Sequence, residues 1–202
     1  MRRLLAALCG ALLVLTGCGL VKEAGDVLPV RNWGPYQKAY DCWTRHEQIH
    51  RDLSLVLDAQ ATYRSPQFQE AYLRRWAEVY RLPKAESVRQ LAEAREQAGR
   101  ELRFVLVAQT GRREWNDFTK PDSIWKVFLQ NERGERVPLT ARRHLENRTE
   151  VEGFFDLGPW AEAYELSFEL PEGGFNAREL TLGVASVLGE TQFSWDLEGA
   201  GR

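Results

Sequence analysis

The chain has 202 residues, with 27 Lys and Arg against 29 Asp and Glu, which gives a formal net charge of −2 at pH 7. This length suits one domain with a proper hydrophobic core. The near-neutral charge and the lack of any Lys/Arg cluster argue against nucleic acid or an anionic surface as a partner.

The N-terminus has the pattern of a secretory signal. Two arginines at positions 2 and 3 precede an apolar run, "LLAALCGALLVL", which is too short to be a comfortable permanent membrane span. The run ends in Thr16-Gly17-Cys18, where small residues precede the cysteine. We therefore predict that residues 1–17 are a signal peptide.

The sequence "LTGC" at positions 15–18 resembles the lipobox of bacterial lipoproteins. In that class the cysteine thiol is diacylated, the chain is cut just before it, and the new amino group is commonly acylated. The resemblance implies a lipid on Cys18 that anchors the protein without spanning the membrane, facing the periplasm. Gly19, in place of an Asp, favours the outer over the inner membrane. An ordinary secretory signal or an uncleaved anchor is the alternative.

Residues 18–35 carry Gly and Pro without a hydrophobic period, and we interpret them as the lipidated cysteine and a tether. Residues 36–202 are predicted to form a single globular domain, in which 36–100 hold a hairpin and two helices and 101–202 a β-sandwich. Residues 36–43 fit a short helix or a covering segment. Cys42 is the one thiol left after the lipid-bearing cysteine, so no disulfide framework is expected.

The clearest early pattern runs from Leu53 to Tyr63, where apolar residues alternate with polar ones. This period of two predicts a strand with one buried face. The stretch "WTRHEQIH", residues 43–50, is then the preceding strand of a hairpin. A helical stripe that includes Trp43 and Ile49 leaves a helix as the alternative.

Two helices are predicted next. Ser65-Pro66 supplies an N-cap and a first-turn proline, and an aromatic face follows as far as Leu82. The second helix, about 85–98, ends at Gly99 and is poor in apolar residues, so we expect it to lie on the surface.

The remainder reads as short strands separated by turns. We predict strands over 104–108, 124–129, 136–140, 151–155, 164–170, 180–188 and 191–197. Leu157, Pro159 and Tyr164 loosely resemble the tyrosine corner of immunoglobulin-like sandwiches. The expected fold is mainly β (α+β): an antiparallel immunoglobulin-like β-sandwich with two helices inserted after an N-terminal hairpin.

The motif HEQIH at positions 46–50 matches the HExxH of zinc metalloproteases. On a helix, His46 and His50 would reach one metal, Glu47 would activate the bound water, and Glu70 stands at the spacing of a third ligand. On a strand the two histidines lie about 13 Å apart. Glu70 also has Arg74 as an ordinary i+4 partner. We therefore predict no metal, no cofactor and no catalytic residue, with a zinc hydrolase as the alternative.

Seven tryptophans are many for this length, and Trp115 and Trp160 fall in predicted loops. Tryptophans on loops at one end of a sandwich commonly build sugar- or peptide-binding surfaces. Alternatively both rings cap the open ends of the core, which we favour because buried Trp is common. The third histidine, His144, lies in a polar strand end or turn.

These observations predict a lipid-anchored envelope protein with a non-enzymatic binding or accessory domain, whose partner is an envelope protein or a glycan. Besides the zinc hydrolase, the alternative is a glycan-binding module that uses Trp115 and Trp160.

Overall fold

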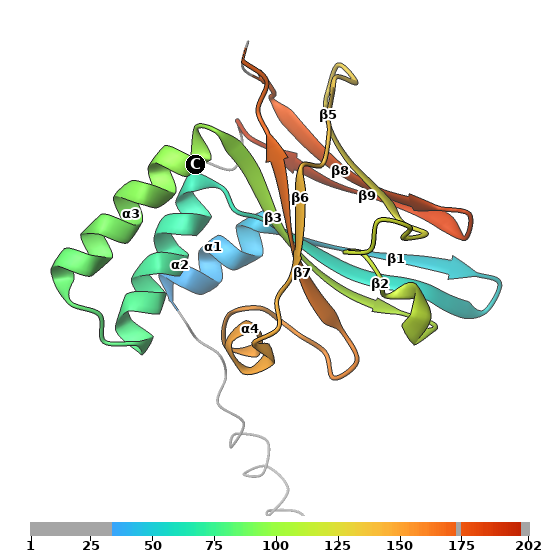
Figure 1. The fold of residues 1–202 in the computed structure, drawn as a ribbon, viewed down its shortest axis with the longest axis horizontal. Coiled ribbons are helices and arrows are strands. Elements are labelled where there is room, and N and C mark those ends of the chain that lie inside the picture. The colour runs from blue at the N-terminus through green and yellow to red at the C-terminus, as the bar shows by residue number, and fades with distance from the viewer. Residues whose placement is uncertain (1–33, 173–174, 199–202) are drawn as a thin grey trace, which may run out of the picture. The chain divides into compact units, whose positions relative to one another are not determined.

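Two antiparallel β-sheets form the framework of the computed structural model, which describes residues 34–172 and 175–198 (Figure 1). The predicted signal peptide, Cys18 and nearly all of the tether lie outside the described residues. In the described part of the chain, no helix is both long and apolar enough to cross a membrane. The described residues belong to one compact unit.

The fold class is confirmed: an α+β protein with a mainly β, antiparallel sandwich. The first sheet has the order β1 (Thr44–Arg51), β2 (Ser54–Tyr63), β3 (Glu101–Thr110), β7 (Glu162–Glu169) and β6 (Ala141–His144). The second has the order β5 (Arg136–Val137), β4 (Lys126–Asn131), β8 (Glu179–Ser186) and β9 (Gly189–Asp196). The N-terminal hairpin β1–β2 thus continues the sheet begun by β3.

The core between the sheets is aromatic. The Trp195 ring lies 5.3 Å from that of Phe104 and 6.2 Å from that of Tyr63, centroid to centroid. All three side chains are buried, and the indole N–H of Trp195 donates to the Trp43 carbonyl at 2.9 Å. Each such ring contributes about 1.5–3 kcal/mol through burial, and the hydrogen bond joins β9 to the end of α1.

The predicted hairpin is confirmed, with residues 44–51 as a strand. His46 pairs with Gln60 across β1 and β2, and the turn is made by Asp52, whose φ of 55° is left-handed, and by Leu53. Asp tolerates this conformation because its short side chain bonds locally.

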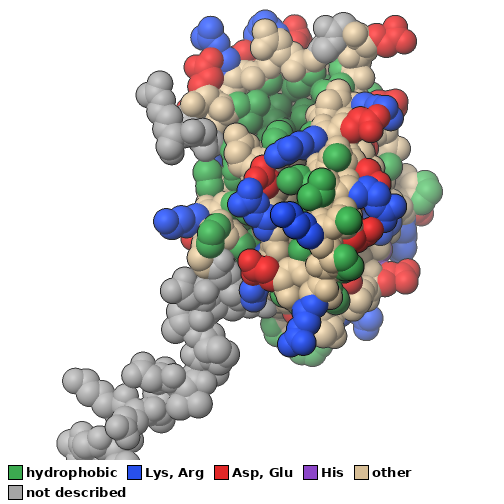
Figure 2. All heavy atoms as spheres, turned by 90° about the vertical axis from the view of Figure 1, so that its left-hand side faces the viewer, with side chains coloured by type: hydrophobic (Ala, Val, Ile, Leu, Met, Phe, Trp, Pro, Cys, Tyr) green, Lys and Arg blue, Asp and Glu red, His purple; other side chains and the backbone are tan. Residues whose placement is uncertain are grey.

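The helices α1 (Pro35–Trp43), α2 (Pro66–Val79) and α4 (Arg148–Phe154) lie on the outer face of the first sheet, which is the face away from the second sheet. The helix α3 (Lys84–Ala98) packs mainly against α2, and the 3₁₀ turn η1 (Arg113–Trp115) follows β3. The predicted cap is confirmed, since Ser65 Oγ accepts from the Phe68 amide at 3.1 Å. The second predicted helix ends at Gly99 as expected, and Ala94 is the buried residue of α3. Acidic and basic side chains are interspersed on this side of the molecule (Figure 2).

The strand predicted over 151–155 is wrong, because these residues belong to α4 and its C-terminal end. Asn147 caps the helix, and its Oδ1 accepts from the Glu150 amide at 3.3 Å. Val151, Phe154 and Phe155 have the i, i+3, i+4 spacing of a helical face and are buried. The Phe154 ring reaches Tyr72 of α2, 4.9 Å away.

The strand predicted over 136–140 is shorter than expected. Only Arg136 and Val137 pair with β4. Pro138 follows directly and has no N–H to donate to a ladder, which ends the strand.

Candidate functional site

The HEQIH motif lies on β1 and not on a helix. His46 Nε2 is hydrogen-bonded to Asp58 Oδ1 of β2 at 2.5 Å, and its side chain is 51% exposed. At ~3.3 Å per strand residue, His46 and His50 stand about 13 Å apart, too far to share a metal. Gln48 Nε2 donates to the same Asp58 carboxylate at 2.9 Å. The motif is therefore part of a polar cross-strand ladder.

Glu70 is equally committed to other partners. Its carboxylate accepts from Arg74 at 2.5 Å and from Arg95 of α3 at 3.1 Å. The predicted i+4 pair is thus present, and a second arginine joins α2 to α3. Among the described residues, no group of three or more His, Cys, Asp or Glu side chains is placed to hold a metal ion.

Trp160 is placed where a ligand can reach it. The ring is 78% exposed and lines a cleft of about 640 Å³, so the interpretation that it caps the core is wrong. Trp115 is half-buried in η1, its ring lies 5.0 Å from the Arg112 guanidinium, and it does not line the cleft. The cleft is also lined by residues from β3, the β3–β4 connection with η1, β6, α4, the α4–β7 loop and β7: Thr110, Arg113, Asn116, Asp117, Thr119, Lys120, His144, Arg148, Pro159, Glu162 and Tyr164.

One wall of the cleft is the connection between β3 and β4, residues 111–125. It begins at Gly111, where a Cβ would stand 2.2 Å from the Leu55 carbonyl oxygen, so only glycine fits this close approach. Phe118 and Trp125 anchor the segment as a buried stacked pair with centroids 5.5 Å apart. This wall is therefore fixed by the core before any ligand arrives.

Tyr164 ties the floor of the cleft to this wall. Its hydroxyl donates to the Asn116 carbonyl and contacts the Asn116 side-chain oxygen, both at 2.9 Å. Burial raises the pKa of Tyr164, and the charges of Glu162 and Asp117 add to the rise, so the hydroxyl keeps its proton. The Tyr164 hydroxyl is thus bonded to the β3–β4 connection. In a tyrosine corner it would instead bond to the backbone a few residues before the tyrosine.

The opposite rim is the turn that carries Trp160. Arg148 of α4 donates to the Gly158 carbonyl at 2.7 Å and to the Ala161 carbonyl at 3.0 Å. The buried Ala161 closes the turn. An exposed indole on a backbone held at both ends is preorganised, so little entropy is lost when a ligand packs against it.

The charges of the cleft are mixed. His144 Nε2 is hydrogen-bonded to Glu162 Oε2 at 2.9 Å, with both side chains 39% exposed. Lys120 and Asp117 add one charge of each sign. Such a lining offers hydrogen-bond donors and acceptors and has no dominant sign, which suits a neutral polar ligand better than a polyanion.

Sequence reasoning identified Trp160 and His144 individually but not the cleft between them. Asn116, Arg148, Glu162 and Tyr164 were missed. The alternation in "YELSFEL", residues 164–170, indicated a strand, but nothing local says which polar residues face another segment.

Comparison of the chain with protein-family models, with curated proteins and with solved structures finds no significant match in any of the three.

Proposed function

We propose that this protein is a lipid-anchored, non-enzymatic binding protein of the bacterial cell envelope, and that the cleft beside Trp160 binds a neutral saccharide. The observation that carries the proposal is the 78% exposure of the Trp160 ring at the rim of a rigid polar cleft. The other large rings of the domain are at most about half exposed, with Tyr80 at 47%. An indole that a well-formed turn holds in solvent adds little to the stability of the fold, but it is well placed to contact a ligand.

The chemistry of a sugar matches both parts of the cleft. The C–H face of a pyranose packs on an indole, which supplies a large apolar area with few rotatable bonds. The hydroxyls at the ring edge need paired donors and acceptors, which Asp117, His144 and Glu162 offer. The volume of about 640 Å³ lies within the range of small-molecule sites.

The anchoring part of the proposal is supported by the lipobox-like "LTGC" and by Gly19. A diacylated Cys18 would hold the domain at the periplasmic side of a membrane, the outer membrane by preference. We propose no catalytic role for the HEQIH motif, because its strand geometry does not bring His46, His50 and Glu70 to one point.

Titration of the full chain in detergent micelles with three neutral tetrasaccharides (chitotetraose, cellotetraose and maltotetraose) tests the binding. We expect at least one to change the tryptophan fluorescence, and Trp160→Ala to weaken its affinity roughly tenfold or more, about 1.4 kcal/mol. Trp160→Phe should retain part of the affinity. Val187→Ala truncates another exposed apolar side chain, on the β8–β9 turn, and should leave binding unchanged. No binding by any of the three, or full affinity in Trp160→Ala, would refute the proposal.

Lipidation has its own test. Cells that express the chain are grown with labelled palmitate, and we expect the label on the native protein and none on Cys18→Ala. Equal labelling of the two proteins would show that the lipid is not carried by this cysteine.

A further inference from the structure

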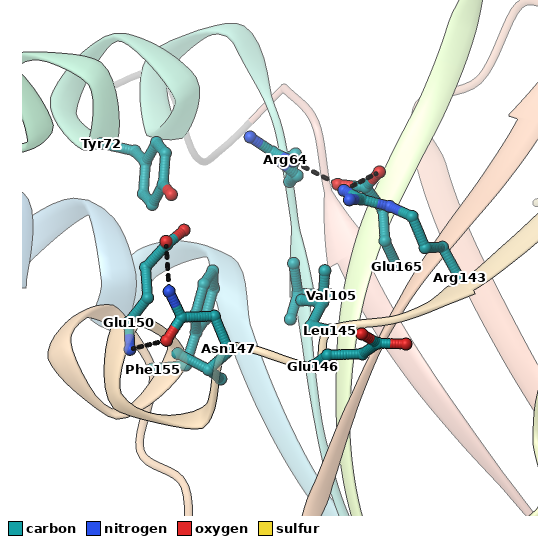
Figure 3. A pocket seen from close by; sticks show the side chains of 11 residues that line it. Arg64, Tyr72, Val105, Arg143, Leu145, Glu146, Asn147, Glu150, Phe155 and Glu165 are labelled. Carbon is teal, nitrogen blue, oxygen red and sulfur yellow. Dashed lines mark hydrogen bonds and ion pairs between the residues drawn. The ribbon is translucent and has the colours of Figure 1, made fainter.

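A second, smaller pocket lies on the outer face of the first sheet, beneath α2 and α4 (Figure 3). Its volume is about 240 Å³, below the range typical of drug-sized ligands, so it suits a smaller molecule. The apolar part of its lining comes from Val105 of β3, Leu145, and Val151 and Phe155 of the α4 region. This pocket is separate from the Trp160 cleft and does not depend on its function.

One wall of the pocket is cationic. Glu165 of β7 accepts from Arg64 at 2.5 Å and from Arg143 of β6 at 3.1 Å, on either side of its carboxylate (Figure 3). Arg103, two residues before Val105 on β3, does not line the pocket and has Glu101 as its ion partner at 3.5 Å. The side chains of Arg64 and Glu165 are only 13% and 14% exposed. Arg64 and Arg143 thus share one carboxylate at this wall, which leaves the three groups together with one positive charge; Glu146 also lines the pocket, but it is exposed.

The charges of this wall act on one another through a partly dry medium. Burial lowers the pKa of Arg103, and the nearby charge of Arg64 lowers it further. Burial alone would raise the pKa of Glu165, but the charges of Arg64, Arg143 and Arg103 outweigh it and hold the pKa below its ordinary value. An additional carboxylate at this wall would therefore be favoured.

The other side of the pocket is anionic. Glu150 of α4 lies across from Arg143, with the Tyr72 side chain above it (Figure 3). Its carboxylate accepts from the Asn147 amide at 3.1 Å, and within the described chain it forms no ion pair. Burial raises the pKa of Tyr72 to about 12, so its hydroxyl stays protonated at neutral pH. A half-buried carboxylate without a cationic partner is suited to receive an ammonium group.

We propose that this pocket binds a free α-amino acid with a branched apolar side chain. The ligand carboxylate lies at the Arg64–Arg143 wall, the ammonium faces Glu150, and the side chain packs on Val105 and Phe155. A zwitterion finds an opposite charge at both walls. A simple anion would be repelled by Glu150, and a simple cation would be repelled by the arginines.

Calorimetric titration of the full chain tests this with three probes: L-leucine, 4-methylpentanoate, which lacks the amine, and 3-methylbutylamine, which lacks the carboxylate. We expect L-leucine to bind about tenfold or more tightly than either half-ligand. Glu150→Gln should remove that advantage over 4-methylpentanoate, because only the ammonium loses its partner. Arg143→Gln, at a side chain 67% exposed, should weaken both carboxylate-bearing probes.

Two controls keep the outcome specific. Glu152→Gln changes a half-exposed carboxylate on the same helix that pairs with Arg148 outside the pocket, and it should bind L-leucine like the native chain. Trp160→Ala should also bind L-leucine normally, which separates this site from the saccharide cleft. The proposal is overturned if L-leucine does not bind, if either half-ligand binds as tightly, or if Glu150→Gln keeps native affinity while its thermal unfolding matches that of the native chain.

Discussion

The pocket and the cleft lie on opposite faces of the same two strands. Along β6 and β7, Arg143 pairs in register with Glu165, and the next pair, His144 with Tyr164, faces the other way. Strand alternation therefore sends Arg143 and Glu165 to the pocket and His144, Glu162 and Tyr164 to the cleft. Each site contains a carboxylate hydrogen-bonded to a basic side chain, but the Arg64–Glu165 pair is nearly buried and the His144–Glu162 pair is partly exposed.

This difference in burial decides what each pair can do. Arg64 and Glu165 are held by the helices that cover them, so losing either partner strands a charge in a medium that solvates it poorly. His144 and Glu162 remain 39% exposed, so water can replace either partner at little cost. The buried pair therefore adds to the integrity of the fold, and the exposed pair is available to a ligand.

The largest expected effect is on the free energy of unfolding, and it should distinguish a variant that lacks Glu165 from one that lacks Glu162. Glu165→Ala should lower the free energy of unfolding by about 3 kcal/mol, because Arg64 loses its carboxylate partner in a mostly buried place. Glu162→Ala should cost less than about 1 kcal/mol. Urea unfolding of the two variants measures both values. Equal losses would show that burial does not distinguish the two faces.

Acid should weaken the pocket through the same carboxylate. Folding holds the pKa of Glu165 below its ordinary value of 4.5, so the unfolded chain binds more protons at this residue as the solution becomes acidic. The stabilisation provided by the ionised Glu165 is complete above the pKa that this residue has in the unfolded chain. It is lost as the pH falls through the lower pKa of the same residue in the folded chain. From about pH 6 to about pH 3, the free energy of unfolding should therefore fall more steeply for the native chain than for Glu165→Gln. Parallel pH dependences in the two proteins would contradict this.

An intermediate effect is expected where the two regions meet. α4 gives Arg148 to the cleft and Glu150 to the pocket, and Asn147 caps the helix. Asn147→Ala should lower the free energy of unfolding by about 1 kcal/mol through the lost cap, and it should weaken L-leucine and the saccharide together. Asn147→Asp, which can cap the same amide, should restore most of the stability. Chemical unfolding with both titrations checks this, and loss of only one ligand would show that the sites do not share the helix.

The smallest effect on stability is expected at the cleft rim. Trp160→Ala removes a mostly exposed ring, so the free energy of unfolding should change by no more than about 0.5 kcal/mol while the saccharide affinity falls roughly tenfold or more. A much larger loss of stability would mean that the ring belongs to the core of the domain in solution.

Local patterns in the sequence were sufficient to predict most of the helices and strands. The alternation up to Tyr63 gave β2, Ser65 and Pro66 marked the start of α2, and Gly99 marked the end of α3. It failed over 151–155, where a short run of Val and Phe reads equally well as strand or helix. There the decision came from the Asn147 cap and from aromatic partners on α2, which lies about 75 residues earlier in the chain.

The sites themselves were decided by tertiary structure. The sequence alone indicated an apolar N-terminal run that ends in the lipobox-like "LTGC", a loop position for Trp160 and a polar face for β7. Only the assembled sheet placed Arg64 beside Glu165, about 100 residues apart, and only the covering by α2 and α4 made that pair buried. Hydrophobic periodicity shows which face of an element avoids water, but it does not show which distant segment will cover the polar face. Whether such a segment is present decides if the polar residues form a buried charge cluster or line an open cleft.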